Sequence, residues 1–220
     1  MIKSATIEFL KDLAANNNRE WFADNKPAFE AAKENVIEFT GAILAELKAI
    51  NPLLAKDTDP KKCVMRIYRD IRFRLDKTPY KNNFGISKLL GDTNNDSIEF
   101  YVQIQPGRCL AGGGYWMPEA AHLKAIRQEI DYNADELKAI IDKPEFKKLF
   151  GEFRDQEQLK SLPRDYAADN ENISLLKLKS FAALHQFTDA EILQKDSPKK
   201  VAEVLANIYP LTVFLNNAIV

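Results

Sequence analysis

One segment of the chain, residues 66–81, interleaves cationic and aromatic side chains and reads RIYRDIRFRLDKTPYK. The forked guanidinium of arginine binds phosphate and carboxylate through paired hydrogen bonds, and tyrosine rings beside it can form the walls of a ligand site. These residue types therefore indicate a site for an anionic ligand. The side chains that we expect to bind it are Arg66, Tyr68, Arg69, Arg72, Lys77, Tyr80, Lys81, Tyr101, Tyr115 and Lys179.

Two carboxylates in this segment, Asp70 and Asp76, are the candidates for catalytic residues. Neighbouring arginines keep the pKa of an aspartate low, which suits the orientation of those arginines better than proton transfer. The sequence leaves open whether the protein is an enzyme. If it is one, we expect hydrolysis or transfer of a phosphoryl or carboxyl group, assisted by one of the two aspartates.

Two other interpretations of the same residues stay open. The arginines can form ion pairs with Asp70, Asp76 and Glu99 on a solvated sheet face without any ligand. Alternatively, the protein is a binding module without chemistry, for single-stranded nucleic acid or an acidic protein partner, because arginines and exposed tyrosines stack on bases and follow phosphates. A pI near 6.2 argues against a dedicated nucleic-acid protein.

The net charge of the whole chain conceals this basic segment. The chain has 31 Lys and Arg against 32 Asp and Glu, a formal net charge of −1. Residues 61–88 contain nine basic and two acidic side chains, a local balance of +7, so the remaining residues sum to −8. We therefore expect an anionic small molecule as the partner, bound near this segment.

No motif for a cofactor, a metal ion or a nucleophilic serine accompanies the basic segment. The G-x-S-x-G elbow, the P-loop and the G-x-G-x-x-G fingerprint are all absent from the sequence. His122 and His185 lack metal-binding spacing, and Cys63 and Cys109 are isolated. We therefore expect neither a cofactor nor a metal site.

The elements that position these residues are predicted by periodicity. Residues 1–51 are helical, with apolar positions spaced by three or four over a long helix that has Pro27 in its first turn. The strand-rich region 61–116 shows alternation instead, which predicts strands over 63–73, 98–105 and 108–116. Three glycines in the last strand, residues 112–114, permit a bulge or a close backbone approach.

Helical periodicity returns over residues 117–220, with a further strand near 181–187. Helices, then consecutive strands, then helices predict a single α+β domain over residues 1–220 with one antiparallel sheet. We expect helices from both termini to pack on one face of that sheet and leave the other face polar and basic.

The composition excludes several classes of protein. With 45% hydrophobic residues and two cysteines, the chain fits neither a disordered protein nor a disulfide scaffold. It has no apolar run long enough to cross a bilayer, and MIKSATIEFLKDL at the start lacks the apolar core of a signal peptide. We therefore expect a cytoplasmic protein with no membrane partner, and the sequence predicts no oligomeric state.

Five motifs, in order, resemble an uncharacterised bacterial family, domain of unknown function 2461. They are NNREWF at 17–22 followed by Lys26, R-x-Y-R-D-x-R-F at 66–73 with D-K-x-P-Y-K at 76–81, GGGYWxP at 112–118, IRQEI at 126–130, and LLKLKSF at 175–181. The resemblance spans nearly the whole chain. It implies a single α+β domain without an assigned activity, and it supplies no catalytic residue.

Overall fold

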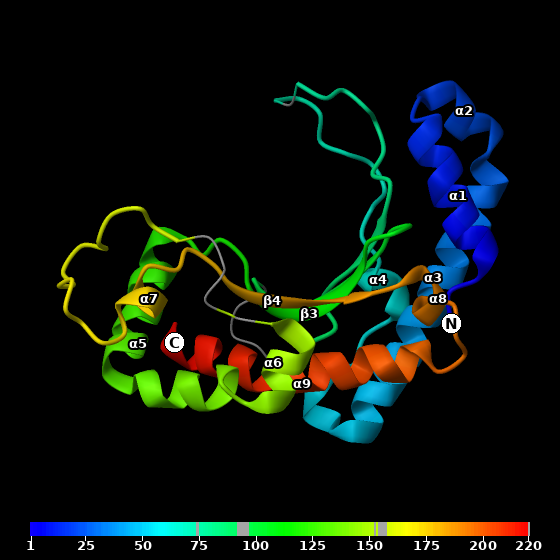
Figure 1. Ribbon diagram of the computed structural model, residues 1–220. Coiled ribbons are helices and arrows are strands. Elements are labelled where there is room, and N and C mark those ends of the chain that lie inside the picture. The colour runs from blue at the N-terminus through cyan, green and yellow to red at the C-terminus, as the bar shows by residue number, and fades with distance from the viewer. Residues whose placement is uncertain (74, 92–96, 152, 154–157, 220) are drawn as a thin grey trace. The chain divides into compact units, whose positions relative to one another are not determined.

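A computed structural model describes residues 1–73, 75–91, 97–151, 153 and 158–219 of the chain (Figure 1). Its helices are α1 (Ser4–Ala15), α2 (Arg19–Asp24), α3 (Lys26–Ile50), the 3₁₀ helix η1 (Pro52–Leu54), α4 (Pro60–Cys63), α5 (Ala120–Ile141), α6 (Pro144–Phe150), α7 (Ile173–Leu176), α8 (Asp189–Ile192) and α9 (Ser197–Ala218). Its strands are β1 (Phe84–Ile86), β2 (Ile98–Ile104), β3 (Cys109–Tyr115) and β4 (Phe181–Phe187).

The four strands form one antiparallel sheet in the order β1-β2-β3-β4, which confirms the predicted α+β class. Neighbours in the sheet are neighbours in the chain, so no crossover is needed. In the pairing of β1 with β2, Phe84 lies opposite Ile104 and Ile86 opposite Val102. The alternating apolar side chains of β2 are all buried, as their period of two predicts.

The chain folds into two compact units, and β2, β3 and β4 each supply residues to both. In the first unit α3 packs against β1, where the rings of Phe29 and Phe84 stack at 6.2 Å. In the second, Ile208 of α9 packs close to Gly113 of β3. Helices from both termini therefore pack against the sheet, as predicted, whereas the single domain stays a prediction. The first unit comprises residues 1–91, 101–111 and 186–203, and the second 92–100, 112–185 and 204–220.

Helix ends follow the polar residues and prolines of the sequence. The side chain of Asn18 accepts a hydrogen bond from the Trp21 N–H at 2.9 Å and caps α2. Helix α3 has Pro27 in its first turn and Asn51 as its C-cap residue, as predicted. Helix α5 kinks at Asn133, whose φ of −128° and ψ of 36° are not helical.

The prediction of a strand over residues 63–73 is wrong. Cys63 ends α4, and residues 64–73 form only isolated bridges, Val64 with Ile86 and Tyr68 with Tyr80. Of the apolar side chains in the segment's alternating set, Ile67 is buried, whereas Met65 and Phe73 are exposed. The segment stays bonded to β1 only as far as Met65, whose N–H donates to the Gly85 carbonyl at 2.9 Å. Beyond Met65 it has little apolar surface to bury against the sheet, so it pairs with its own return instead.

Residues 64–83, described except for residue 74, form an irregular two-stranded arm whose tip is residues 70–78. The backbone N–H of Lys81 donates to the carbonyl of Ile67 at 2.7 Å, and that of Arg69 donates to the carbonyl of Pro79 at 2.9 Å. In Figure 1 the arm rises beside α1 and α2. The basic residues that the sequence placed on a sheet face therefore lie on this arm.

The glycines of β3 allow the close approach that the sequence predicted. A Cβ on Gly112 would lie 2.0 Å from the carbonyl oxygen of Ala183 in β4. We therefore expect Gly112→Ala to lower the free energy of unfolding by roughly 3 kcal/mol, measured by urea denaturation. Gly41→Ala in α3 is the control, because its Cβ would meet only the Pro60 side chain, with Cγ at 3.4 Å and Cβ at 3.9 Å. Equal midpoints for the two variants would contradict this account of β3.

Candidate functional site

An aromatic cluster attaches the arm to the helices. The ring of Tyr80 stacks on that of Phe22 in α2 with centroids 4.0 Å apart and planes 14° apart. Phe22 in turn contacts Phe29 of α3 at 5.0 Å, and Tyr68 lies 5.4 Å from Tyr80 across the arm. Tyr80 and Phe22 are buried, whereas Tyr68 is 54% exposed. Burial of these rings holds the arm against α2.

A side-chain amide adds directional contacts to this attachment. The Tyr80 N–H donates to Asn17 Oδ1 at 3.1 Å, and Asn17 Nδ2 donates to the Tyr80 carbonyl at 3.0 Å. Asn17 thus satisfies both backbone groups of Tyr80, as a neighbouring strand residue would. The amide and the stack together fix the position of Lys81, the next residue in the chain.

Asp76 organises the tip of the arm. Its carboxylate accepts the Thr78 N–H at 2.9 Å, the Thr78 hydroxyl at 2.8 Å and Arg69 Nη1 at 2.5 Å. These contacts, chiefly the Thr78 N–H and then the Arg69 guanidinium, lower the pKa of Asp76 to about 2. A carboxylate with so low a pKa is a weak base at neutral pH, so the geometry supports an orienting role for Asp76.

A second ion pair lies within the tip. Arg72 Nε donates to Asp70 Oδ1 at 3.0 Å and its Nη2 donates to Oδ2 at 2.7 Å, a bidentate arrangement. Hydrogen bonding to Asp70 raises the pKa of Arg72 further. Both side chains are exposed to water, so the pair orders the tip more than it stabilises the fold. The predicted ion-pair interpretation therefore accounts for Arg69 and Arg72.

Lys81 differs from these paired cations. It is half-buried, and burial, followed by the nearby charge of Arg66, lowers the pKa of its ammonium. Within the described part of the chain, no carboxylate forms an ion pair with Lys81 or Arg66. The arm therefore holds two cations whose charge is not balanced by the described side chains around them.

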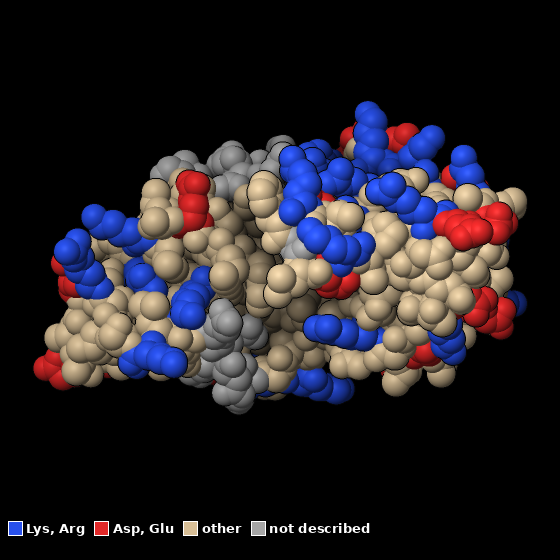
Figure 2. Space-filling model, turned by 90° about the horizontal axis from the view of Figure 1, so that it is seen from above, with Lys and Arg blue, Asp and Glu red and all other residues tan. Residues whose placement is uncertain are grey.

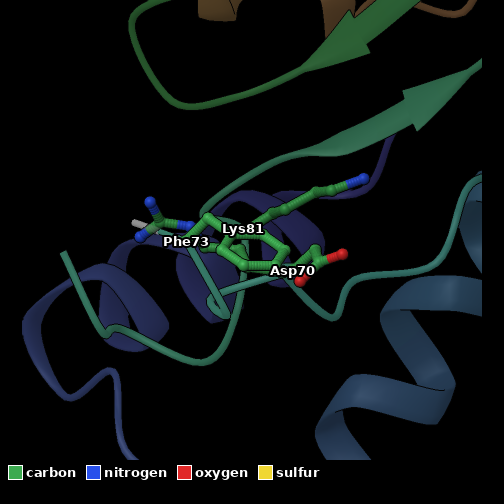
Figure 3. Close-up of a pocket in the computed structure, with 4 residues that line it drawn as sticks. Asp70, Phe73 and Lys81 are labelled. Atoms are coloured by element: carbon green, nitrogen blue, oxygen red, sulfur yellow. The ribbon is translucent and has the colours of Figure 1, made fainter. Parts of the chain in front are cut away.

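Two pockets meet at Arg69 and Lys81. The first, of about 660 Å³, is lined by these two residues with Asp70 and Phe73 (Figure 3). In this view the Asp70 carboxylate and the Lys81 ammonium extend to the same side. The second, of about 440 Å³, includes Asn17 among its lining residues. Figure 2 looks down on the arm, where Lys and Arg side chains gather.

A third pocket, of about 640 Å³, lies between α2 and the tip. Its walls include Asn18 and Arg19 on the helix side, and Lys77 and Pro79 on the arm. Lys77 Nζ donates to the Ile71 carbonyl at 2.9 Å, so this cation helps to close the tip.

The predicted site residues fall into separate groups. Tyr101 lies on β2 in the same unit as the arm, and its hydroxyl donates to Gln103 Oε1 at 3.1 Å. Tyr115 and Lys179 belong to the second unit, where the buried Tyr115 hydroxyl lies 2.7 Å from Nδ1 of His122. The residues that the arm brings together are Arg66, Tyr68, Arg69, Asp70, Arg72, Asp76, Lys77, Tyr80 and Lys81.

Sequence reasoning missed three contributors to the site. These are Asn17, Phe22 and Phe73, which are absent from the predicted site residues. The available signal is the run of three asparagines before α2, since only Asn18 is needed to cap that helix. The structure shows that Asn17 serves the arm instead.

Among the residues that the structure describes, no group of three or more His, Cys, Asp or Glu side chains is arranged to hold a metal ion. None of the described helices combines the length and the apolar character needed to cross a membrane.

The fold and the site define an α+β protein with one antiparallel sheet and a basic arm anchored by aromatic rings. The family described as "Conserved hypothetical protein (DUF2461)" matches residues 5–214 of the chain. The chain belongs to this family, which confirms the resemblance of the five motifs. No curated protein and no solved structure matches the chain.

The Asn17 contacts predict a measurable role in holding the arm. We expect Asn17→Ala to lower the free energy of unfolding by about 1 to 2 kcal/mol, because two partly buried hydrogen bonds are lost. The Arg-rich arm should also become more sensitive to trypsin. Asn16→Ala is the matched control, since it removes one exposed hydrogen bond to Asp12 and should change neither property appreciably. An arm equally resistant to trypsin in Asn17→Ala would contradict this role.

The low pKa of Asp76 predicts acid sensitivity of the tip. The folded pKa of about 2 lies below the ordinary value of 3.8, so protonation favours the opened tip. The tip keeps the stability that this carboxylate contributes above the ordinary pKa, and loses it as pH falls to about 2. Carboxyl ¹³C NMR titration should give that midpoint.

A variant separates the contacts that lower the pKa of Asp76. Thr78→Val keeps the backbone N–H, the largest cause, and removes the hydroxyl. The midpoint should therefore rise but stay below 3.8. A wild-type midpoint at the ordinary value would show that the tip contacts are absent in solution.

Proposed function

We propose that the arm binds an anionic small molecule bearing a phosphate or carboxylate group. The binding site is where the two pockets meet, at Arg69 and Lys81. The observation that carries this proposal is the half-buried ammonium of Lys81, which the described carboxylates leave without an ion pair. Removing a charge from water costs free energy unless a partner compensates. A bound anion between Lys81, Arg69 and the nearby Arg66 would provide that compensation.

The orientation of Arg69 supports the same ligand class. Its described hydrogen bonds to Asp76 and Thr78 both leave from Nη1, so Nε and Nη2 are available to donate to a ligand. A guanidinium held by a carboxylate on one side loses less freedom when it binds an anion on the other. We infer that Asp76 orients Arg69 for binding.

The proposal covers binding, and catalysis stays a prediction. Hydrolysis or transfer would need Asp70 or Asp76 as acid or base, and both carboxylates already accept hydrogen bonds from arginine. The expected cytoplasmic location likewise stays a prediction.

Calorimetric titration with inorganic phosphate, citrate and nucleoside phosphates tests the proposal. We expect at least one of these anions to bind, and Lys81→Met to weaken its binding about tenfold or more, as loss of a charged hydrogen bond does. Lys11→Met on α1 is the matched control, because it removes the same charge from an exposed site. The proposal fails if no anion binds, or if the two variants bind equally well.

The pH dependence of binding gives a second measure within the same experiment. Binding requires the charged ammonium, and the pKa of Lys81 is lowered. Affinity should therefore fall as pH rises through that lowered pKa, before an ordinary lysine would lose its proton.

A second candidate function is a binding module for single-stranded nucleic acid or an acidic protein. It is favoured by Phe73, which is 95% exposed and has the Arg72 guanidinium 5.8 Å from its ring centroid. Oligonucleotide binding that weakens steeply with salt would favour this function. Metabolite binding without oligonucleotide binding would favour the first function.

A further inference from the structure

The tip of the arm displays two apolar side chains that nothing described covers. Phe73 is 95% exposed and Leu75 is 103% exposed, more than any other large apolar side chain that the structure describes. Moving such apolar side chains out of water lowers the free energy. Their exposure at one tip therefore indicates that they bind an apolar partner.

The tip is held in shape by polar contacts on both sides of these residues. Before Phe73, the Asp70 carboxylate binds Arg72 in a bidentate pair. After Leu75, Asp76 accepts hydrogen bonds from Thr78 and Arg69. These contacts hold the described backbone before Phe73 and after Leu75, the two apolar side chains that the tip exposes.

The charge around the two side chains is positive. Residues 66–81 contain six basic and two acidic side chains, a balance of +4. Both acidic side chains are engaged with arginines of the arm. Apolar side chains projecting from a cationic rim complement the interface of an anionic bilayer, where negative headgroups cover an apolar interior.

We propose that the tip of the arm is a peripheral membrane anchor, which inserts Phe73 and Leu75 into an anionic bilayer while Arg72 and Lys77 contact lipid phosphates. The sequence alone led us to expect no membrane partner, because it contains no apolar run that could span one. Insertion of a tip needs no such run. The inference goes beyond the proposed function. Phe73 also lines the Lys81 pocket, whereas Leu75 does not, and insertion of the two side chains does not require an anion bound at Lys81.

Two alternative partners fit the tip less well. Nucleic-acid bases stack on flat rings, and Leu75, the more exposed of the two side chains, offers none. A stable protein interface buries roughly 800 Å² per partner, whereas two side chains present only a few hundred Å². A bilayer accepts a small inserted tip because the cations around it add further attraction.

Co-sedimentation of the full chain with lipid vesicles tests the anchor. Wild type should bind vesicles of equal phosphatidylserine and phosphatidylcholine, and bind pure phosphatidylcholine weakly. The double variant Phe73→Ser, Leu75→Ser should bind at least tenfold more weakly, and Lys77→Gln roughly fivefold. The matched control is Leu53→Ser, Tyr132→Ser, which alters two exposed apolar side chains elsewhere and should bind as wild type does.

Insertion has its own readout. Phe73→Trp should show fluorescence that brominated lipids quench, whereas Tyr132→Trp, at another exposed position, should gain no quenching over the wild-type tryptophans. Circular dichroism of each variant confirms that these exposed substitutions leave the fold intact.

Several outcomes would overturn the anchor. These are no vesicle binding, equal binding by the Phe73→Ser, Leu75→Ser variant, or self-association that this variant abolishes, which would make a second copy of the chain the partner. Oligonucleotide binding lost in Phe73→Ser but kept in Leu75→Ser, without vesicle binding, would assign the tip to base stacking. The phosphate titration of Lys81→Met is independent of all these results, so failure of the anchor and failure of the anion site are distinguishable.

Discussion

The attachment of the arm to the N-terminal helices is the interaction on which the site depends. The base of the arm bonds to β1, where the Met65 N–H donates to the Gly85 carbonyl at 2.9 Å. Beyond that point the arm is not a strand of the sheet, and the Phe22–Tyr80 stack and the two Asn17 hydrogen bonds hold it in position. The rings continue from Phe22 to Phe29 at 5.0 Å and from Phe29 to Phe84 at 6.2 Å. A continuous series of aromatic contacts thus connects the arm to β1, and through it to the core of the first unit.

The electrostatics of the arm depend on this attachment. Pairing with Asp76 and Asp70 orders Arg69 and Arg72, while Tyr80 brings the next residue, Lys81, into a half-buried position. The ion-pair and ligand-binding interpretations of the basic segment therefore apply to different residues. The ion-pair interpretation describes Arg69 and Arg72, which pair with the two aspartates of the tip. The ligand-binding interpretation is supported at Lys81, next to the tip, with which the described carboxylates do not pair.

The family motifs acquire physical roles in the two units. NNREWF and the arm motif meet in the first unit through Asn17, Phe22 and Tyr80. In the second, the guanidinium of Arg127, from IRQEI, donates to the carbonyls of Leu176 and Leu178 at 2.7 and 3.2 Å. The glycine motif meets LLKLKSF there as well, because a Cβ on its third glycine would lie 2.1 Å from the carbonyl oxygen of Phe181. Each motif therefore maintains contacts between segments distant in sequence.

The sequence by itself determined the α+β class, the strands β2, β3 and β4, the helix α3, the return of helices over residues 117–220, and the cationic and aromatic content of the arm. Those features depend on local periodicity, prolines and caps, which neighbouring residues specify. Only the tertiary structure decided that residues 63–73 form no strand, that Tyr115 and Lys179 lie in the other unit, and which cations are paired. Alternation shows which side chains share a face, but burial of that face requires a partner surface. Beyond Met65 the partner of the arm is α2 rather than the sheet.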